Sequence, residues 1–231
     1  MNKSTVFSYF NRVKMPCFSL SSVPTFMKKM RNIQPIVGGH YYHIYNRGIS
    51  GQKIFLEKKN YSFFLEKFKE YTSKVANILA YTLLEDHFHA LVYVKEDKHN
   101  EVKGSCLQVP NHPDFCRQMT HFFTIYVQSF NKQYQRKGSL FVSPFRRKLI
   151  ESDLYLGSVM FYIHANAEHH GYIDDFRDWP YSSYGQIVDG QSELIDTAWI
   201  YEWFGSRGNF IKFHTSNQKL MTERKWVIEP K

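Results

Sequence analysis

The chain has 231 residues, of which 43% are hydrophobic and 17% aromatic, and its net charge is +9. This basic, aromatic composition favours a nucleic-acid partner, because Lys and Arg contact phosphates and rings stack on bases. Three cysteines without CxxC spacing argue against a disulfide framework, and no apolar run approaches the roughly 20 residues of a membrane span. We therefore expect a cytoplasmic protein without a membrane span.

The first half of the chain alternates between strand-like and helix-like stretches. Tyr and Ile before an Asn-Arg-Gly turn indicate a strand, whereas Phe64, Leu65 and Phe68 recur at helical spacing behind a capping residue, Asn60. Two apolar runs joined by Glu85-Asp86 then indicate an antiparallel hairpin. The predicted elements are an arm at 1–36, a strand at 40–48, a helix at 60–74 and paired strands at 77–84 and 87–94.

The second half contains two further helices and a short basic strand. Ser152 is expected to cap the second of these helices, which ends at Gly171. The predicted elements are a loop at 95–114, a helix at 115–136, a strand at 146–152 and a helix at 153–170. Beyond residue 184 we expect a weakly structured extension or a short helix near 198–204.

This order of elements is the split βαβ pattern followed by one more helix. It predicts an α+β, ferredoxin-like fold, with helices on one face of a four-stranded antiparallel sheet and a C-terminal catalytic helix. We divide the chain into an arm at 1–36, a central domain at 37–184 and an extension at 185–231. Because this fold carries many functions, the motifs must decide between them.

Two histidines in the second hairpin strand are separated by one residue. Strand residues alternate between faces, so His87, His89 and Leu91 share one face of the sheet. Two imidazoles at this spacing can hold one metal ion from the same side, although hydrogen-bonded structural histidines are the commoner meaning of the motif alone. A metal site would need a third ligand from elsewhere.

The helix at 153–170 offers a candidate partner for the histidines. Tyr162 and Asn166 are four residues apart and share a helix face. A tyrosine hydroxyl becomes a useful nucleophile when a cation polarises its target, and an amide oxygen suits a hard cation such as Mg²⁺ or Mn²⁺. Core packing is the commoner role for such a pair. His169 and His170 are further candidate ligands, and His164 ranks lower because it lies on another helix face.

Four stretches of the chain together resemble one known family in order and rough spacing. They are HYYHIYNRG, EDHFHALVYV, RKGSLFVSPFRRKLI and YIHANAEHHGYIDDFRDWPYSSY, which lie between residues 40 and 184. The combination is similar to the single-tyrosine transposases of the HUH nuclease superfamily, particularly the REP-associated tyrosine transposases. This resemblance implies that His87, His89 and Asn166 bind Mg²⁺ or Mn²⁺ and that Tyr162 is the nucleophile.

The resemblance also implies a reaction and a substrate. Members of the family cleave and rejoin single-stranded DNA through a covalent 5′-phosphotyrosine, at a hairpin or palindromic repeat. This chain departs from the family in two places. It has Glu85-Asp86 where Pro-Asn usually precedes the first histidine, and Ala167-Glu168 where Pro-Val usually follows the asparagine.

Basic residues around the motifs predict contacts with DNA phosphates. Three consecutive cations on one strand cannot all face the same way, because strand side chains alternate. The candidates are Arg47, Lys132, Arg136, Lys137, Arg146, Arg147 and Lys148.

Three other functions are compatible with these motifs. The first is a domesticated, non-catalytic DNA-binding relative that acts as a regulator. The others are an HUH enzyme of another class, such as a replication initiator or relaxase, and an unrelated hydrolase with an HxH metal site. A single tyrosine after the histidines favours the transposase class, because the other HUH classes often carry paired tyrosines. Both a monomer and a homodimer with shared sites fit the sequence.

Overall fold

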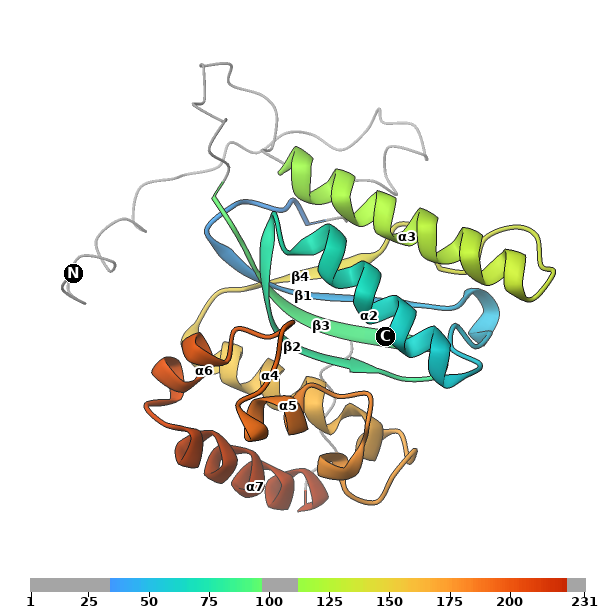
Figure 1. The fold of residues 1–231 in the computed structure, drawn as a ribbon. Coiled ribbons are helices and arrows are strands. Elements are labelled where there is room, and N and C mark those ends of the chain that lie inside the picture. Colours follow the sequence, from blue (N-terminus) through green and yellow to red (C-terminus); the bar gives the residue numbers. More distant parts are fainter. Residues whose placement is uncertain (1–33, 97–111, 224–231) are drawn as a thin grey trace, which may run out of the picture. The chain divides into compact units, whose positions relative to one another are not determined.

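A four-stranded antiparallel sheet forms the centre of the fold (Figure 1). The structure is a computed structural model that describes residues 34–96 and 112–223. The strands are β1 (His40–Arg47), β2 (Ala76–Leu83), β3 (His87–Val94) and β4 (Arg146–Ile150). Their order, β2-β3-β1-β4, and their antiparallel pairing are those of the split βαβ fold, which confirms the predicted fold class.

Helices cover both faces of this sheet (Figure 1). On one face, α2 (Lys58–Thr72) packs against α3 (Pro113–Gln133). The opposite face is covered by α4 (Asp153–His169), with α5 (Tyr184–Asp189), α6 (Thr197–Phe204) and α7 (Arg207–Glu223) around it. Two short 3₁₀ turns, Ile49–Gly51 and Phe176–Asp178, complete the described elements.

The two faces of β3 carry different chemistry, as the period of two predicts. Phe88 faces the helix pair α2–α3, where its ring centroid lies 5.0 Å from that of Phe64 and 6.1 Å from that of Phe123. His89 faces α4, where its ring lies 5.5 Å from that of Tyr162. The predicted division between a packing face and a histidine face is confirmed.

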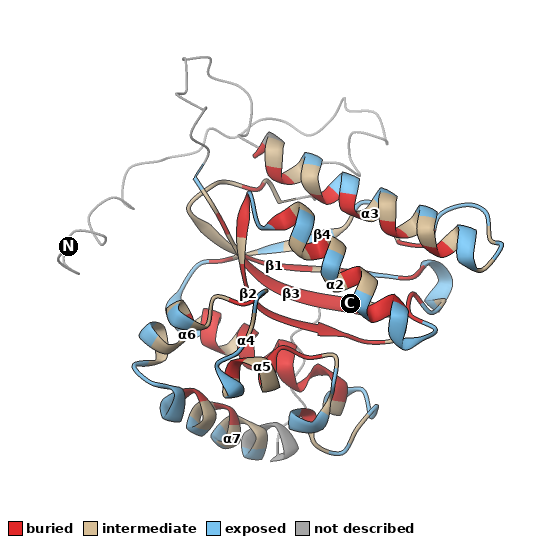
Figure 2. Cartoon of the chain, viewed as in Figure 1, coloured by how far each residue is buried: buried red, intermediate tan, exposed pale blue. Residues whose placement is uncertain are grey.

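Helix α4 is buried around most of its circumference (Figure 2). Every residue from 156 to 167 except Ser158 is buried, which explains why this stretch contains no charged side chain. The predicted ends are confirmed: Ser152 accepts a hydrogen bond from the Tyr155 N–H at 3.3 Å, and Gly171 adopts a left-handed φ of +71°. The sheet and the C-terminal helices thus hold α4 from several sides.

Some local predictions were wrong or incomplete. Helix α2 begins at Lys58, and Asn60 is its third residue, with a side-chain oxygen that accepts from the Glu57 N–H in a capping box. Ile36 is fully buried, so the end of the expected arm belongs to the folded domain. The short helix near 198–204 is confirmed as α6, whereas α7 was not expected. Residues 1–33 of the arm and 97–111 of the loop lie outside the described residues.

The chain after α4 closes the outer edge of β2. The Leu83 N–H donates to the Tyr181 carbonyl at 2.9 Å, and the Ser183 N–H donates to the Tyr81 carbonyl at 3.0 Å. Further along, the Asp196 N–H donates to the Ile78 carbonyl at 3.3 Å. These bonds satisfy backbone groups that an edge strand otherwise leaves open. The proposed boundary between residues 184 and 185 stays a prediction.

A buried histidine pair fastens α7 to α4. His164 Nδ1 lies 2.9 Å from His214 Nε2, and His164 Nε2 lies 2.9 Å from the Ser183 hydroxyl. His214 Nδ1 donates to the Phe210 carbonyl at 2.9 Å, so the proton of the neutral His214 ring is on Nδ1. His214 Nε2 then accepts from His164 Nδ1, which leaves His164 Nε2 to accept from the Ser183 hydroxyl. Burial lowers the pKa of His214 to about 4 and lowers the pKa of His164 well below its usual value. Both rings are therefore neutral at physiological pH.

Candidate active site

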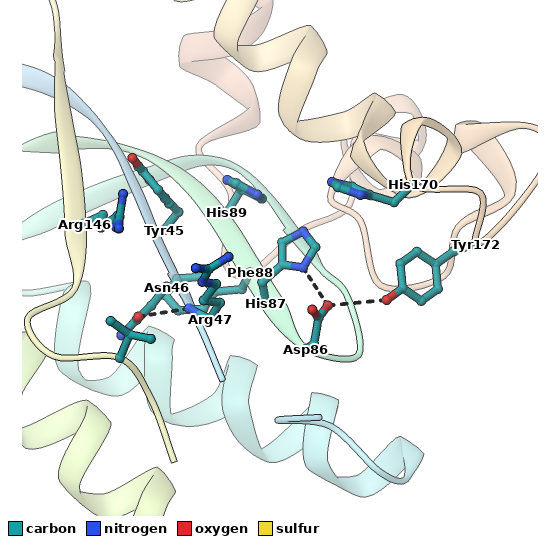
Figure 3. A pocket seen from close by; sticks show the side chains of 11 residues that line it. Tyr45, Asn46, Arg47, Asp86, His87, Phe88, His89, Arg146, His170 and Tyr172 are labelled. Carbon is teal, nitrogen blue, oxygen red and sulfur yellow. Dashed lines mark hydrogen bonds and ion pairs between the residues drawn. The ribbon is translucent and has the colours of Figure 1, made fainter. Parts of the chain in front are cut away.

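A cavity of about 360 Å³ opens beside the HxH motif (Figure 3). Its walls come from β1, the turn between β2 and β3, β3, the segment around β4 and the segment after α4. The lining residues are Tyr45, Asn46, Arg47, Asp86, His87, Phe88, His89, Val142, Arg146, His170 and Tyr172. The cavity thus combines both histidines of the motif with two arginines, one carboxylate and two tyrosines.

His87 is held between a carboxylate and an amide. Its Nδ1 lies 2.7 Å from Asp86 Oδ1, and its Nε2 lies 3.1 Å from Asn166 Oδ1. The hydrogen bond from His87 is the largest of the effects that hold the pKa of Asp86 below its usual value. An ionised carboxylate can only accept, so the Nδ1 of His87 carries a proton.

His89 is held by a second histidine that sequence reasoning did not identify. His89 Nδ1 and His43 Nε2 share a hydrogen bond of 2.8 Å, and both rings are buried. Burial, and secondarily the charge of Lys148, lowers the pKa of His43 to about 3. Burial, together with the neighbouring imidazoles, lowers the pKa of His89 well below its usual value. A neutral imidazole is the form that binds a metal ion.

Helix α4 brings the predicted tyrosine and asparagine to the histidine face. The Tyr162 ring lies edge-on to His89 at 5.5 Å and to His43 at 6.0 Å between ring centroids. Asn166, one turn later, is fully buried against His87. The four residues predicted from the sequence therefore converge. Tyr162 is only 6% exposed, however, and it is not among the residues that line the cavity.

The spacing of His87 and Asn166 fits two neighbouring ligands of a hard cation. Asn166 Oδ1 and His87 Nε2 are separated by 3.1 Å, close to the roughly 3 Å between neighbouring ligands of an octahedral cation. Two buried polar atoms around the motif, Asn166 Nδ2 and Thr82 Oγ1, have no hydrogen-bond partner among the described residues. Within that same part of the chain, no three His, Cys, Asp or Glu side chains form a ligand group. A cation here would rely on two imidazoles and one amide oxygen.

The other histidines in α4 and directly after it differ in their placement. His170 lines the cavity, and its ring centroid lies 5.0 Å from that of His87. His164 instead belongs to the buried network with His214, which agrees with its lower rank as a ligand.

The predicted phosphate contacts on the strands divide by face. Arg47 and Arg146 line the cavity, and Lys148 is exposed on the same sheet face as Arg146. Arg147 points to the opposite face, where its Nε donates to the Gln34 carbonyl at 2.6 Å and its guanidinium lies over the Phe145 ring. The alternation of strand side chains accounts for this division.

The predicted contacts in the last turn of α3 and in the turn after it are not among the residues that line the cavity. Lys132 and Lys137 are exposed, whereas Arg136 donates to Asn131 and Gln52 side chains. Arg136 thus holds the turn after α3 in place, and the two lysines remain available to solvent. Contacts of all seven predicted basic residues with DNA stay predictions.

Four residues of the site were not assigned a role by sequence reasoning. His43, Tyr45 and Tyr172 were not singled out, and Asp86 was noted only as a departure from the family pattern. The alternation of β1 could have placed His43 and Tyr45 on the histidine face. No local signal identifies Tyr172, whose hydroxyl donates to Asp86 Oδ1 at 3.4 Å from a segment 86 residues away in the sequence.

Comparisons with known proteins identify a class whose fold and sequence this chain resembles. No family model matches the chain. A solved structure of a REP-associated tyrosine transposase bound to a REP hairpin matches with a TM-score of 0.52 and 15% identity, over 70% of this chain and 86% of that chain. The chain therefore has the fold of these transposases. A bacterial tRNA(His) guanylyltransferase-like protein in complex with GTP matches with a TM-score of only 0.39 and 10% identity, over 62% of this chain and 70% of that chain.

One curated relative supports the same class at the level of sequence. A Haemophilus influenzae protein, provisionally named a REP-associated tyrosine transposase, is 29% identical over 125 residues. The match covers 52% of this chain and 65% of the length of that relative. The resemblance to REP-associated tyrosine transposases is thus confirmed in both sequence and fold. No helix among the described residues has the length and apolar character needed to cross a membrane.

Proposed function

We propose that this protein cleaves and rejoins single-stranded DNA through a covalent 5′-phosphotyrosine at Tyr162. The observation that carries the proposal is the convergence of α4 on the HxH motif, with Asn166 Oδ1 3.1 Å from His87 Nε2 and Tyr162 edge-on to His89. The relative and the structural neighbour named above support a transposase, and the hairpin bound to that neighbour supports hairpin DNA as the substrate.

The proposed cation site consists of His87, His89 and Asn166, with Mg²⁺ or Mn²⁺ as the ion. When bound, such an ion would polarise a phosphate oxygen and stabilise the negative charge of the transition state. This role requires His89 to donate through Nδ1 to His43, so that its Nε2 keeps a lone pair. The low pKa values of His43 and His89 support neutral rings in this arrangement.

The chemical step moves one phosphate between two oxygens. The Tyr162 oxygen bonds to phosphorus, the bond from phosphorus to the 3′ oxygen breaks, and that oxygen takes a proton to give a free 3′-OH. The phenolic proton passes to solvent. Attack by another 3′-OH reverses the step and releases the tyrosine, so rejoining needs no external energy source. Tyr162 is only 6% exposed, so the proposal requires the scissile phosphate to be brought to a largely buried side chain.

The decisive assay is covalent attachment to DNA. We expect the full chain, incubated with a 5′-labelled or 3′-labelled single-stranded hairpin and Mn²⁺, to form a denaturant-resistant adduct that carries only the 3′ label. EDTA should prevent it, and peptide mapping should locate the DNA on Tyr162. An adduct on Tyr45 or Tyr172, the two tyrosines that line the cavity, would contradict the assignment.

A non-catalytic DNA-binding regulator is the second candidate. The burial of Tyr162 and the lack of a three-residue ligand group among the described His, Cys, Asp and Glu favour it. It predicts hairpin binding that weakens with salt and yields no adduct under any metal condition. The cytoplasmic location and the choice between monomer and homodimer stay predictions for both candidates.

The cavity arginines give a separate prediction about binding. Replacing both Arg47 and Arg146 by Gln should weaken hairpin binding about 10–100-fold at ~0.1 M salt, because two phosphate contacts are lost. The slope of log affinity against log salt should fall by about 1.4, since each contact on single strands contributes ~0.7. Fluorescence anisotropy at several salt concentrations measures both quantities.

The matched control carries the same change of charge at another place. Lys132→Gln together with Lys137→Gln removes two exposed cations, one from the last turn of α3 and one from the turn that follows, and neither lines the cavity. We expect a smaller loss of affinity and a smaller change of slope. Equal effects from the two double variants would mean that the general positive charge, and not the cavity, binds the strand.

A further inference from the structure

The turn between β2 and β3 places a carboxylate behind the first histidine of the motif. Asp86 Oδ1 lies 2.7 Å from His87 Nδ1 (Figure 3). The other ring nitrogen, Nε2, is the one that faces Asn166. A neutral imidazole that donates a hydrogen bond through Nδ1 has a free lone pair on Nε2. The hydrogen-bond partner of one ring nitrogen therefore decides whether the other nitrogen donates or accepts. In the absence of this carboxylate, either nitrogen of His87 could carry the proton.

The Nε2 lone pair of His87 points toward the side-chain amide of Asn166. The Nε2 atom lies 3.1 Å from Asn166 Oδ1, which is also an acceptor. The amide nitrogen of Asn166 has no hydrogen-bond partner among the described residues. Rotation of the amide would let Nδ2 donate to Nε2 in the free protein, and the same rotation would return the oxygen toward a bound cation. The Nε2 lone pair of His87 therefore faces an amide that can offer either an N–H group or, beside a bound cation, its oxygen.

Asp86 is itself fixed by two other segments of the chain. Its carbonyl accepts from the Gly48 N–H at 2.8 Å, which ties the turn to the end of β1. Its Oδ1 accepts from the Tyr172 hydroxyl at 3.4 Å, and the Tyr172 N–H donates to the Ala167 carbonyl at 2.9 Å. Asp86 thus connects the strand that carries the histidines to the end of the helix that carries Tyr162 and Asn166.

The second histidine of the motif has a different kind of support. His89 is backed by the neutral ring of His43, at 2.8 Å, whereas His87 is backed by an anion. The two histidines of the motif therefore differ in the charge of the group that lies behind each ring.

We propose that Asp86 is a positioning residue, which fixes His87 in the tautomer with Nδ1 protonated and directs its Nε2 toward Asn166 as a ligand for a divalent cation. The proposal rests on the proposed function for the identity of the cation. The tautomer and the link to Tyr172 follow from contacts within the chain alone. Carboxylates behind metal-binding histidines typically change metal affinity 10–100-fold when they are removed.

The first test uses the metal-free protein, so that its outcome does not depend on DNA cleavage. Long-range ¹H–¹⁵N spectra of ¹⁵N-labelled protein should show His87 with its proton on Nδ1. Asp86→Ala should shift the population toward the tautomer with Nε2 protonated, whereas Asp86→Asn should retain the wild-type tautomer. A His87 tautomer that is the same in Asp86→Ala as in the wild type would overturn the proposal.

The second test measures Mn²⁺ binding by electron paramagnetic resonance, without DNA. We expect Asp86→Ala to bind about 10–100-fold more weakly and Asp86→Asn to lie between it and the wild type. Glu85→Gln is the matched control, because the neighbouring carboxylate pairs with Lys53 at 2.6 Å and does not contact His87. Equal affinities of Asp86→Ala and wild type would also overturn the proposal. Wild-type protein that binds Mn²⁺ but never forms an adduct would instead refute the proposed reaction and leave the role of Asp86 intact.

Discussion

Tyr162→Phe is expected to lower the rate of adduct formation on hairpin DNA by about 10⁴-fold or more, because the substitution deletes the attacking oxygen. The ring itself remains, so its edge-on contacts with His43 and His89 should be retained. Hairpin affinity and the melting temperature should therefore change little. Single-turnover gel assays at saturating Mn²⁺ measure the rate directly.

Tyr45→Phe is the appropriate control for this experiment. Tyr45 lines the cavity and stacks on His89 with ring centroids 5.6 Å apart, but it lies on β1 and not on α4. We expect its loss to slow the reaction by less than about 10-fold, as for a contact that binds but does not react. If Tyr45→Phe abolished the adduct while Tyr162→Phe preserved it, the nucleophile would have to be reassigned.

Mild acid is expected to remove most of the stability of the metal-free protein. His43, His89, His164 and His214 are buried, and their lowered pKa values keep them neutral in the folded state. In the unfolded chain each histidine titrates near ~6.5, so the unfolded state binds more protons below that pH. His43 and His214 then cost about 2 kcal/mol each between pH 7.5 and pH 5, and His89 and His164 act in the same direction, so the loss is a large part of the roughly 5–15 kcal/mol stability of a typical domain.

The direction of the change in stability and the pH interval in which it occurs can be tested separately. Stability should be full above pH ~6.5 and fall progressively toward the folded pKa values, of which His214 has about 4 and His43 about 3. Ordinary carboxylates titrate near pH ~4, so the interval from pH 6.5 to 5 isolates the histidines. Urea unfolding in EDTA at several pH values gives the slope. A flat profile between pH 6.5 and pH 5 would contradict the prediction.

Most of the fold that could be predicted followed from local sequence patterns, such as strand alternation and helix capping residues. Alternation in β3 separated His87 and His89 from Phe88, and the Ser152 cap and the glycine at 171 bounded α4 correctly. Each of these signals acts through neighbouring backbone, where sequence spacing equals spatial spacing. Helix α7 had no such signal, because its burial depends on contacts with α4 and α6 that only the folded chain provides.

The site was predictable where residues lie on one element and not where they meet across elements. The spacing of Tyr162 and Asn166 placed both on one helix face. In contrast, the hydrogen bond between His43 and His89 joins residues 46 positions apart, and the contact of Tyr172 with Asp86 spans 86. Such pairs depend on strand register and on the path of the chain after α4, which no local pattern specifies. Strand alternation implied that Arg146 and Arg147 point to opposite faces of the sheet. It did not show which of the two arginines faces the cavity.

The segment that closes β2 also determines how far the chain can be shortened. A protein that ends near residue 180 would lose the carbonyl of Tyr181 and the N–H groups of Ser183 and Asp196 that pair with this strand. Buried β2 would then become an open, apolar edge that can pair with the same edge of another copy. Truncated forms should accordingly self-associate or precipitate, even though every residue of the HxH motif and of α4 remains in the chain.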